Sequence, residues 1–244
     1  EDLKNEMQKI NPNLSINSFF CDFSVQDSIR ECANKIKNDL KAIDLLINNA
    51  GVVNTEYSET IDGIENTFAV NHLGYFLFTN LLLDLVKKKS ESRIINVSSA
   101  AHHFVKGMQW DDINYKDDFK MGLKAYGQSK LGNILFTKQL AKRLQKDGVT
   151  VNAIHPGGVN TSLGNQNNSL LGRVLKIILK PFFRSPFKGA NTIIYLAEID
   201  GLSITGAYWV DGRVAKTSHY SKNDAEAEKL WRLSEKLVSQ EFDI

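Results

Sequence analysis

A tyrosine and a lysine stand four residues apart, at Tyr126 and Lys130. On a helix this spacing brings both side chains to one face. A free phenol has a pKa of about 10, which is too high for efficient proton transfer at neutral pH. A neighbouring ammonium group stabilises the phenolate and lowers that pKa. The pair therefore predicts acid–base chemistry, although a solvent-exposed pair of side chains on a helix surface would show the same spacing.

Two further polar residue types occur where chemistry could use them. Ser98 and Ser99 follow the apolar run Arg93–Val97, and a hydroxyl there could donate to a substrate oxygen or simply cap a turn. Asn71 lies in an apolar helical segment, where a buried amide needs partners. Four histidines have no metal-ligand spacing and are interpreted as structural residues: His72, His102, His103 and His155.

The elements that must position these residues alternate between short apolar runs and longer helical patterns. This alternation predicts an α/β fold, a Rossmann-like doubly wound parallel sheet with helices on both faces. The expected strands are Ile16–Phe20, Ile43–Ile47, Arg93–Val97, Val149–Ile154 and Gly206–Val210. The expected helices are Val25–Leu40, Gly63–Lys89, Lys124–Lys146, Lys188–Ala197 and Asn223–Ser239. No linker divides the chain, so residues 1–244 are predicted to form one domain.

Polar or glycine-containing clusters follow four of the expected strands. Asp22 follows the first strand, residues 48–51 the second, Ser98 and Ser99 the third, and residues 155–158 the fourth. Ligands of open parallel sheets bind outside the carboxyl ends of the strands. The clusters therefore predict one binding site at that edge.

In this order and spacing, the motifs resemble the short-chain dehydrogenase/reductase family. They are Asn48-Asn49-Ala50-Gly51, Asn71, Ser99, Tyr126-x-x-x-Lys130 and Pro156-Gly157. Three features are similar to the retinol dehydrogenase branch: Asn71-His72-Leu73-Gly74, Ala101-His102-His103 and the tail Ala225–Leu233. The resemblance covers nearly the whole chain.

The resemblance implies a role for each catalytic candidate. Tyr126 would be the general acid in carbonyl reduction and the general base in alcohol oxidation, and Lys130 would hold the nicotinamide ribose hydroxyls and lower the pKa of the phenol. Ser99 would polarise the substrate oxygen, and Asn71 would support a proton relay. No metal site is implied.

The same resemblance implies a cofactor site for NADP(H), with NAD(H) not excluded. Its contacts would come from Tyr126, Lys130, Asp22, Phe23, Asn49, Ala50, Gly51, Pro156, Gly157, Val159 and Thr161. Asp22 and Phe23 would flank the adenine, and Pro156, Gly157 and Thr161 would contact the nicotinamide end.

One family feature is absent from this sequence. The family opens with a glycine-rich strand-to-helix turn that holds the cofactor pyrophosphate. None of the 16 glycines forms that turn, and the first glycine, Gly51, already belongs to the later motif. We therefore expect an N-terminally truncated copy lacking its first βαβ portion, with weak cofactor binding.

Composition narrows the class of partner. A net charge of +2 gives no reason to expect nucleic acid, and the two cysteines indicate a reduced, cytosol-facing protein. No apolar run is expected to reach the length of a membrane span. The resemblance also makes a homodimer through the helices Gly63–Lys89 and Lys124–Lys146 a possibility.

Residues 148–197 contain no Asp or Glu, and basic residues recur among apolar ones from 170 to 188. Such a segment could close a substrate pocket as a lid or contact an anionic membrane, for example the endoplasmic reticulum, and the two roles are compatible. Either role favours a lipophilic substrate.

The leading hypothesis is an NADP(H)-dependent oxidoreductase that interconverts a lipophilic aldehyde or ketone and its alcohol, with retinal and retinol as the model pair. Two alternatives remain: a short-chain dehydrogenase for steroid or other lipid carbonyls, and a catalytically inactive binding protein on the same fold.

Overall fold

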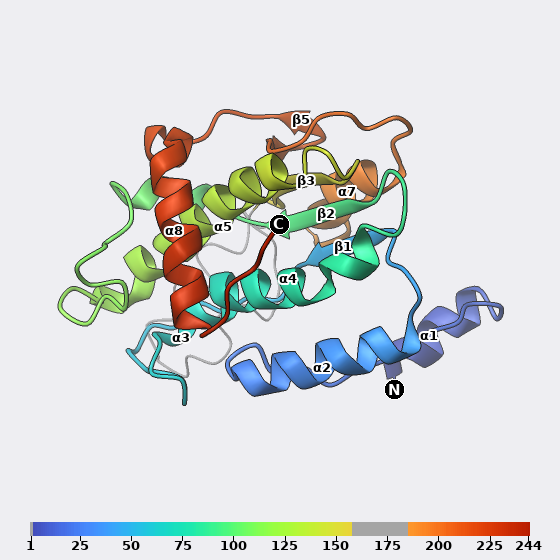
Figure 1. The fold of residues 1–244 in the computed structure, drawn as a ribbon, viewed down its shortest axis with the longest axis horizontal. Helices are drawn as coiled ribbons and strands as arrows, with labels where there is room; N and C mark the ends of the chain where they lie inside the picture. The colour runs from blue at the N-terminus through green and yellow to red at the C-terminus, as the bar shows by residue number, and fades with distance from the viewer. Residues whose placement is uncertain (1, 158–184) are drawn as a thin grey trace.

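The computed structural model describes residues 2–157 and 185–244, which form a parallel sheet covered by helices on both faces (Figure 1). The strand order is β1-β2-β3-β4-β5, with β1 to β4 parallel and β5 antiparallel to β4. The strands are β1 (Leu45–Asn48), β2 (Arg93–Val97), β3 (Thr150–His155), β4 (Tyr208–Val210) and β5 (Arg213–Val214). The expected α/β fold is confirmed, and four of the expected strands form within a few residues of their predicted bounds.

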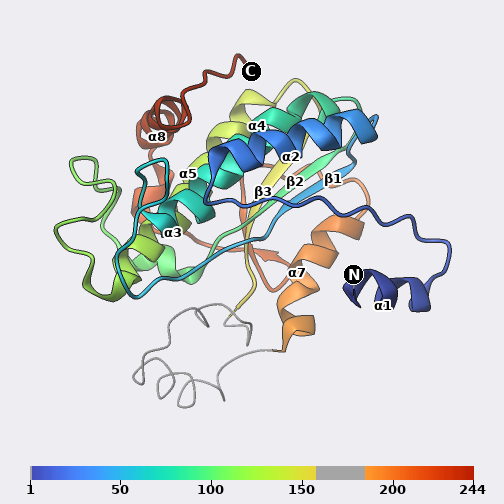
Figure 2. The ribbon, with the colours of Figure 1, turned by 90° about the horizontal axis from the view of Figure 1, so that it is seen from below.

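Helices lie on both faces of the sheet (Figure 2). On one face lie α2 (Gln26–Asp39), α4 (Gly74–Val86) and α5 (Leu123–Arg143), and α7 (Pro186–Glu198) packs against β2 and β3 on the other. This two-sided cover explains why β2 and β3 are almost continuously apolar. Ile94, Ile95, Val151 and Ile154 are all fully buried.

The expected helix Gly63–Lys89 forms as three consecutive pieces. The short helix α3 (Asn66–Phe68) leads into a π-helical turn over Ala69–Leu73, which continues as α4. Together, residues 66–86 are long and apolar enough to cross a membrane, so the sequence expectation that no run reaches this length was wrong. Because 83% of this stretch is buried inside the protein, we interpret it as the central helix of the core.

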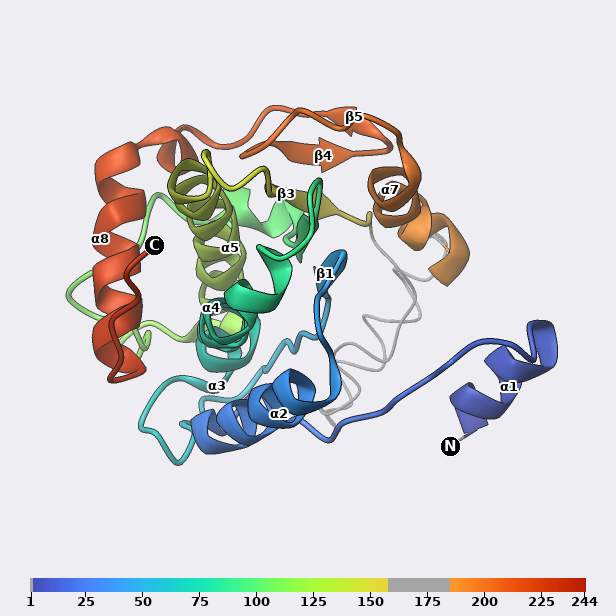
Figure 3. The same cartoon turned by 45° about the vertical axis from the view of Figure 1, so that its right-hand side comes forward.

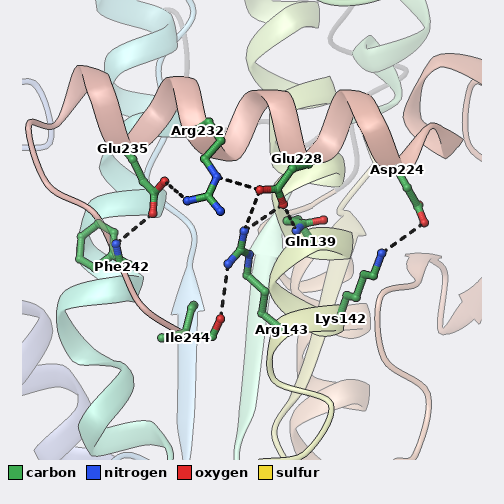
Figure 4. Close-up of polar contacts among 9 residues, drawn as sticks. All are labelled: Gln139, Lys142, Arg143, Asp224, Glu228, Arg232, Glu235, Phe242 and Ile244. Carbon is green, nitrogen blue, oxygen red and sulfur yellow. Dashed lines mark hydrogen bonds and ion pairs between the residues drawn. The ribbon is translucent and has the colours of Figure 1, made fainter.

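Helix α8 (Asp224–Leu237) crosses the outer side of α5 (Figure 1). Trp231 of α8 stacks on Phe136 and meets Phe76 edge-to-face, which buries the indole between α4 and α5. Polar contacts lie beside this apolar contact. The Glu228 carboxylate forms an ion pair with Arg143 at 2.9 Å and accepts a hydrogen bond from Gln139 at 2.5 Å (Figure 4). A homodimer through α4 and α5 would therefore have to form around α8 or displace it.

The segment Ile16–Phe20 does not form the expected strand. It runs without regular structure and pairs with no strand among the described residues, and Phe20 is 82% exposed. A β-strand needs a neighbour for its backbone hydrogen bonds, and here none lies alongside. The preceding helix α1 (Asp2–Ile10) projects away from the body of the molecule (Figure 3).

Candidate active site

The predicted clusters meet at one edge of the sheet because β1, β2 and β3 are parallel neighbours. Residues 49–51 leave the end of β1, Ser98 and Ser99 leave β2, and Pro156 and Gly157 leave β3. Helix α5 lies across β2 and β3 and brings Tyr126 and Lys130 to the same edge. Val159 and Thr161 lie outside the described residues, as does most of the basic segment.

Two glycines set the position of α5. Gly122 precedes the helix with a φ of +70°, and a Cβ there would lie 1.9 Å from the carbonyl oxygen of Asn54. Gly127 faces the 3₁₀ turn Ala100–Phe104, where a Cβ would lie 2.8 Å from the carbonyl oxygen of Ala101. The backbone next to Tyr126 can therefore approach the Ser99 loop closely.

Lys130 is almost completely buried, with 3% of its surface exposed. Its Nζ donates to the Val97 carbonyl at 3.1 Å and lies 5.6 Å from the centroid of the Tyr126 ring. Burial disfavours the charged form and lowers the pKa of Lys130 to about 7. A hydrogen-bonded ammonium beside a phenol is the arrangement that the sequence spacing predicted.

Ser99 and Tyr126 are close enough to interact through their hydroxyls. Burial raises the pKa of Tyr126, and the hydrogen bond with Ser99 opposes that rise. The Ser99 hydroxyl also accepts from the Ala101 amide at 3.1 Å. Ser98 is occupied differently: it is buried, and its hydroxyl donates to the Lys130 carbonyl at 2.7 Å. Of the two serines, only Ser99 is therefore available to a bound molecule.

Asn71 lies in the π-helical turn, whose backbone closes from the Gly74 amide to the Ala69 carbonyl. This wider turn shifts the helical phase and directs the Asn71 amide towards the loop after β1. Its Oδ1 accepts from the Val52 amide at 2.8 Å, and its Nδ2 donates to the Val52 carbonyl and to Ser129, both at 3.0 Å. Asn71 thus fixes the loop that carries the cofactor candidates.

A cavity of about 780 Å³ opens beside this loop. Its lining includes four of the predicted cofactor residues: Asp22, Phe23, Ala50 and Gly51. A Cβ on Gly51 would stand 3.2 Å from Oδ1 of Asn71 and 3.6 Å from Nζ of Lys130, so glycine leaves room for close approach at this point. Asn49 is exposed and does not contribute to the lining.

The remaining cofactor candidates differ in how they are held. Two hydrogen bonds from Ser24 lower the pKa of the Asp22 carboxyl, so it is ionised at neutral pH. Gly157 adopts a φ of +83°, in the left-handed region that favours glycine.

Within residues 2–157 and 185–244, no group of three His, Cys, Asp or Glu side chains could hold a metal ion.

Two residues near the site were not singled out from the sequence. Tyr75 donates to the Ala50 carbonyl at 2.6 Å, and its ring centroid lies 5.9 Å from Nζ of Lys130. Asn133 donates to the same Val97 carbonyl as Lys130, also at 3.1 Å. The available signal was weak: Asn133 is a polar residue within the apolar run Leu131–Phe136 of α5.

Comparison with known proteins gives consistent results. The sequence model of a family described as enoyl-(acyl carrier protein) reductase matches residues 1–212. Retinol dehydrogenase 12 of Bos taurus is 38% identical over 239 residues, which cover 98% of this chain and 74% of that protein. Retinol dehydrogenase 13 of Homo sapiens is 42% identical over 235 residues, which cover 94% and 70%.

A solved structure also matches the whole chain. An uncharacterised protein from Mycobacterium paratuberculosis superposes with a TM-score of 0.74 and 29% sequence identity. The match covers 100% of this chain and 83% of that one.

Proposed function

Because this chain belongs to the short-chain dehydrogenase/reductase family, we propose that it interconverts a lipophilic aldehyde or ketone and its alcohol with NADP(H). The observation that carries the proposal is the placement of the Tyr126 phenol between the hydroxyl of Ser99 and the buried ammonium of Lys130. Retinal and retinol are the substrate pair that we propose first, because the similar proteins are named retinol dehydrogenases.

The proposed roles follow from the geometry of the three side chains. In carbonyl reduction, Tyr126 donates its phenolic proton to the substrate oxygen while Ser99 donates a hydrogen bond to the same oxygen. In alcohol oxidation, Tyr126 accepts the proton. The ammonium of Lys130 stabilises the phenolate in both directions, and Asn71 holds the loop after β1 beside it. The bound nicotinamide would supply or accept the hydride.

The described residues fit a nicotinamide cofactor. Gly51, the ionised Asp22 and the ring of Phe23 line one cavity. A Cβ on Gly51 would stand 3.6 Å from Nζ of Lys130, so this cavity begins near the ammonium. Lys130 would bind the ribose hydroxyls, and Asp22 and Phe23 would contact the adenine. NADP(H) is the proposed cofactor and NAD(H) its alternative. A binding experiment in which the two cofactors compete shows which one the protein prefers.

The test follows NADPH oxidation with all-trans-retinal and compares the chain with its Tyr126→Phe variant. We expect turnover that falls by about 10²-fold or more in the variant, because the phenol supplies the proton. Turnover that survives the substitution would show that the catalytic assignment is wrong. A parallel sample carries the family's glycine-rich unit before residue 1, and a gain in NADPH affinity there supports the truncation hypothesis.

Absence of retinal reduction by both the given chain and the extended protein is also informative. If the extended protein binds NADPH but reduces no retinal, a panel of steroid and lipid carbonyls separates a different substrate from an inactive binding protein. If one of these carbonyls is reduced by the wild-type protein and not by Tyr126→Phe, the proposed catalytic role of Tyr126 stands. Only the proposed substrate then changes.

We also propose that the basic segment 170–188 contacts a cytosol-facing membrane, on the basis of its sequence alone. Flotation with vesicles rich in phosphatidylserine tests this proposal. The triple substitution Arg173/Lys176/Lys180→Glu should release the protein from the vesicles, and unchanged flotation would contradict membrane contact.

A further inference from the structure

A line of buried polar groups runs from the outer helix α8 to Lys130. Ser234 of α8 lies 3.0 Å from Nε2 of His72, in the π-helical turn. His72 faces Asn133 of α5, and Asn133 donates through Nδ2 to the Val97 carbonyl at 3.1 Å. That carbonyl also accepts from Nζ of Lys130. The line therefore joins α8, the central helix, α5 and the end of β2.

Each of the three linking side chains is fully enclosed. Ser234, His72 and Asn133 are all 0% exposed. His72 can reach α5 because Gly132 has no side chain: a Cβ there would stand 3.1 Å from Nδ1 of His72. Burial lowers the pKa of His72 to about 3, so the imidazole is neutral at physiological pH and carries one N–H.

Two buried atoms in the line lack a hydrogen-bond partner within the described residues: Nδ1 of His72 and Oδ1 of Asn133. An unpaired buried polar atom costs about 1–3 kcal/mol. The cost is removed for both atoms if His72 carries its proton on Nδ1 and donates to Oδ1 of Asn133. In this arrangement the Ser234 hydroxyl turns its proton from the Leu230 carbonyl, 2.8 Å away, to Nε2 of His72. Every donor in the line then points towards Val97.

We propose that His72, Asn133 and Ser234 are positioning residues for Lys130. The imidazole N–H holds the Asn133 amide in one orientation, with Nδ2 towards Val97 and Oδ1 away from the ammonium. A reversed amide would offer Oδ1 to Lys130 and draw its Nζ away from Tyr126. The structural part of the proposal stands on the described residues, and its kinetic consequence rests on the proposed function.

Two phenols are the titratable groups that lie beside the ammonium of Lys130 in the described part of the chain. The ring centroids of Tyr126 and Tyr75 are 5.6 and 5.9 Å from Nζ, and burial alone accounts for the lowered pKa of Lys130. No carboxylate among the described residues contributes to that pKa. A reversed Asn133 amide would therefore be a new acceptor for the ammonium, and it would raise the pKa of Lys130.

The test measures the pKa of Lys130 by NMR in the cofactor-free chain labelled with ¹³C at lysine Cε. In His72→Phe, which keeps a ring but loses the N–H, we expect this pKa to rise by about half a unit or more. His72→Asn places an amide N–H near the position of Nδ1, so it should restore the wild-type value. Asn80→Ala is the matched control, because Asn80 is also buried in the central helix and bonds to the Phe76 carbonyl.

The outcomes separate positioning from general stability. All three variants are expected to lose stability, but only His72→Phe should change the titration of Lys130. Equal pKa values of Lys130 in His72→Phe and in the wild type, with both folded, would overturn the proposal. So would an equal change in the Asn80→Ala control.

Turnover adds an independent readout. In alcohol oxidation, the pH profile of His72→Phe should move to higher pH, because a displaced ammonium no longer lowers the pKa of Tyr126. His72→Asn should retain the wild-type profile. If no variant and no wild-type protein shows turnover, the proposed function fails, while the NMR titration still decides the positioning role.

Discussion

The two ends of α5 carry polar clusters of different kinds. Near its start, the buried ammonium of Lys130 donates to the Val97 carbonyl and lies 5.6 Å from the ring centroid of the partly buried Tyr126. Near its end, the mostly buried Arg143 pairs with the half-exposed Glu228 (Figure 4). The Arg143 guanidinium also stacks on the Trp231 ring, 4.3 Å from its centroid. The first cluster contains an ammonium without a carboxylate, whereas the second pairs each charge with its opposite.

This difference has a physical consequence. An unpaired buried ammonium costs stability but has a pKa that can serve proton transfer. A paired guanidinium near the surface holds helices together and has little chemical use. We therefore expect substitutions at the start of α5 to change chemistry and pH dependence, and substitutions at its end to change stability alone.

The largest effect is expected for Lys130→Met, which should lower turnover by about 10²-fold or more. It should also change the pH dependence of stability. Folding lowers the pKa of Lys130 from 10.5 to about 7, so between these values the unfolded chain binds more protons and stability rises with pH. The variant loses this rise. Urea unfolding at several pH values measures it, and an equal rise in the variant would contradict the assignment.

At the other end, Arg143→Ala should lower the free energy of unfolding by about 1–3 kcal/mol without changing turnover. The substitution removes the ion pair with Glu228, the stacking on Trp231 and a bond to the Ile244 carbonyl at 3.4 Å. Thermal and urea unfolding measure the change. A specific loss of turnover in a protein that remains folded would show that the two ends are not separable.

A smaller effect is expected for Gly51→Ala, which tests the space beside Lys130. The added methyl group would stand 3.2 Å from Oδ1 of Asn71 and would occupy part of the proposed cofactor site. We expect the NADPH dissociation constant to rise about tenfold, a free-energy change of about 1.4 kcal/mol. Isothermal titration measures this constant, and unchanged affinity would place the cofactor elsewhere.

The smallest effect is expected for Lys142→Ala, which serves as the control for Arg143→Ala. The Lys142 ammonium is largely exposed and lies 3.8 Å from Asp224. Surface pairs of this kind contribute about 0–1 kcal/mol. If Lys142→Ala lowers the free energy of unfolding as much as Arg143→Ala does, the burial of Arg143 does not explain the stability of this end of α5.

The sequence predicted the parts of the site that depend on local spacing. Tyr126 and Lys130 are separated by one helical turn, and Ser99 and Gly51 follow apolar strands, so their positions follow from periodicity and from the parallel sheet. The π-helical turn at Asn71 was not predicted, because this helix is apolar and buried on nearly all sides, so a shift of helical phase does not show in its hydrophobic pattern. Ile16–Phe20 has the composition of a strand, but strand formation also requires a neighbour.

Contacts between distant residues were the least predictable. His72 was interpreted as a structural histidine, and the sequence contains no signal that pairs it with Ser234, 162 positions later. The same is true of the packing of Trp231 on Phe136. These contacts depend on how α8 crosses α5, which is a property of the assembled fold.

The crossing of α8 over α5 has a consequence for the order of events during synthesis. Because the ribosome makes the chain from its N-terminus, β1, β2, β3 and the Tyr126–Lys130 pair emerge well before Ser234 and Trp231. Until then the imidazole of His72 faces an open surface, with no indole beside α5 to exclude water. Helix α5 therefore gains this support only once α8 has been made, so a chain stalled before residue 224 would carry Tyr126 and Lys130 on a helix whose outer side is uncovered.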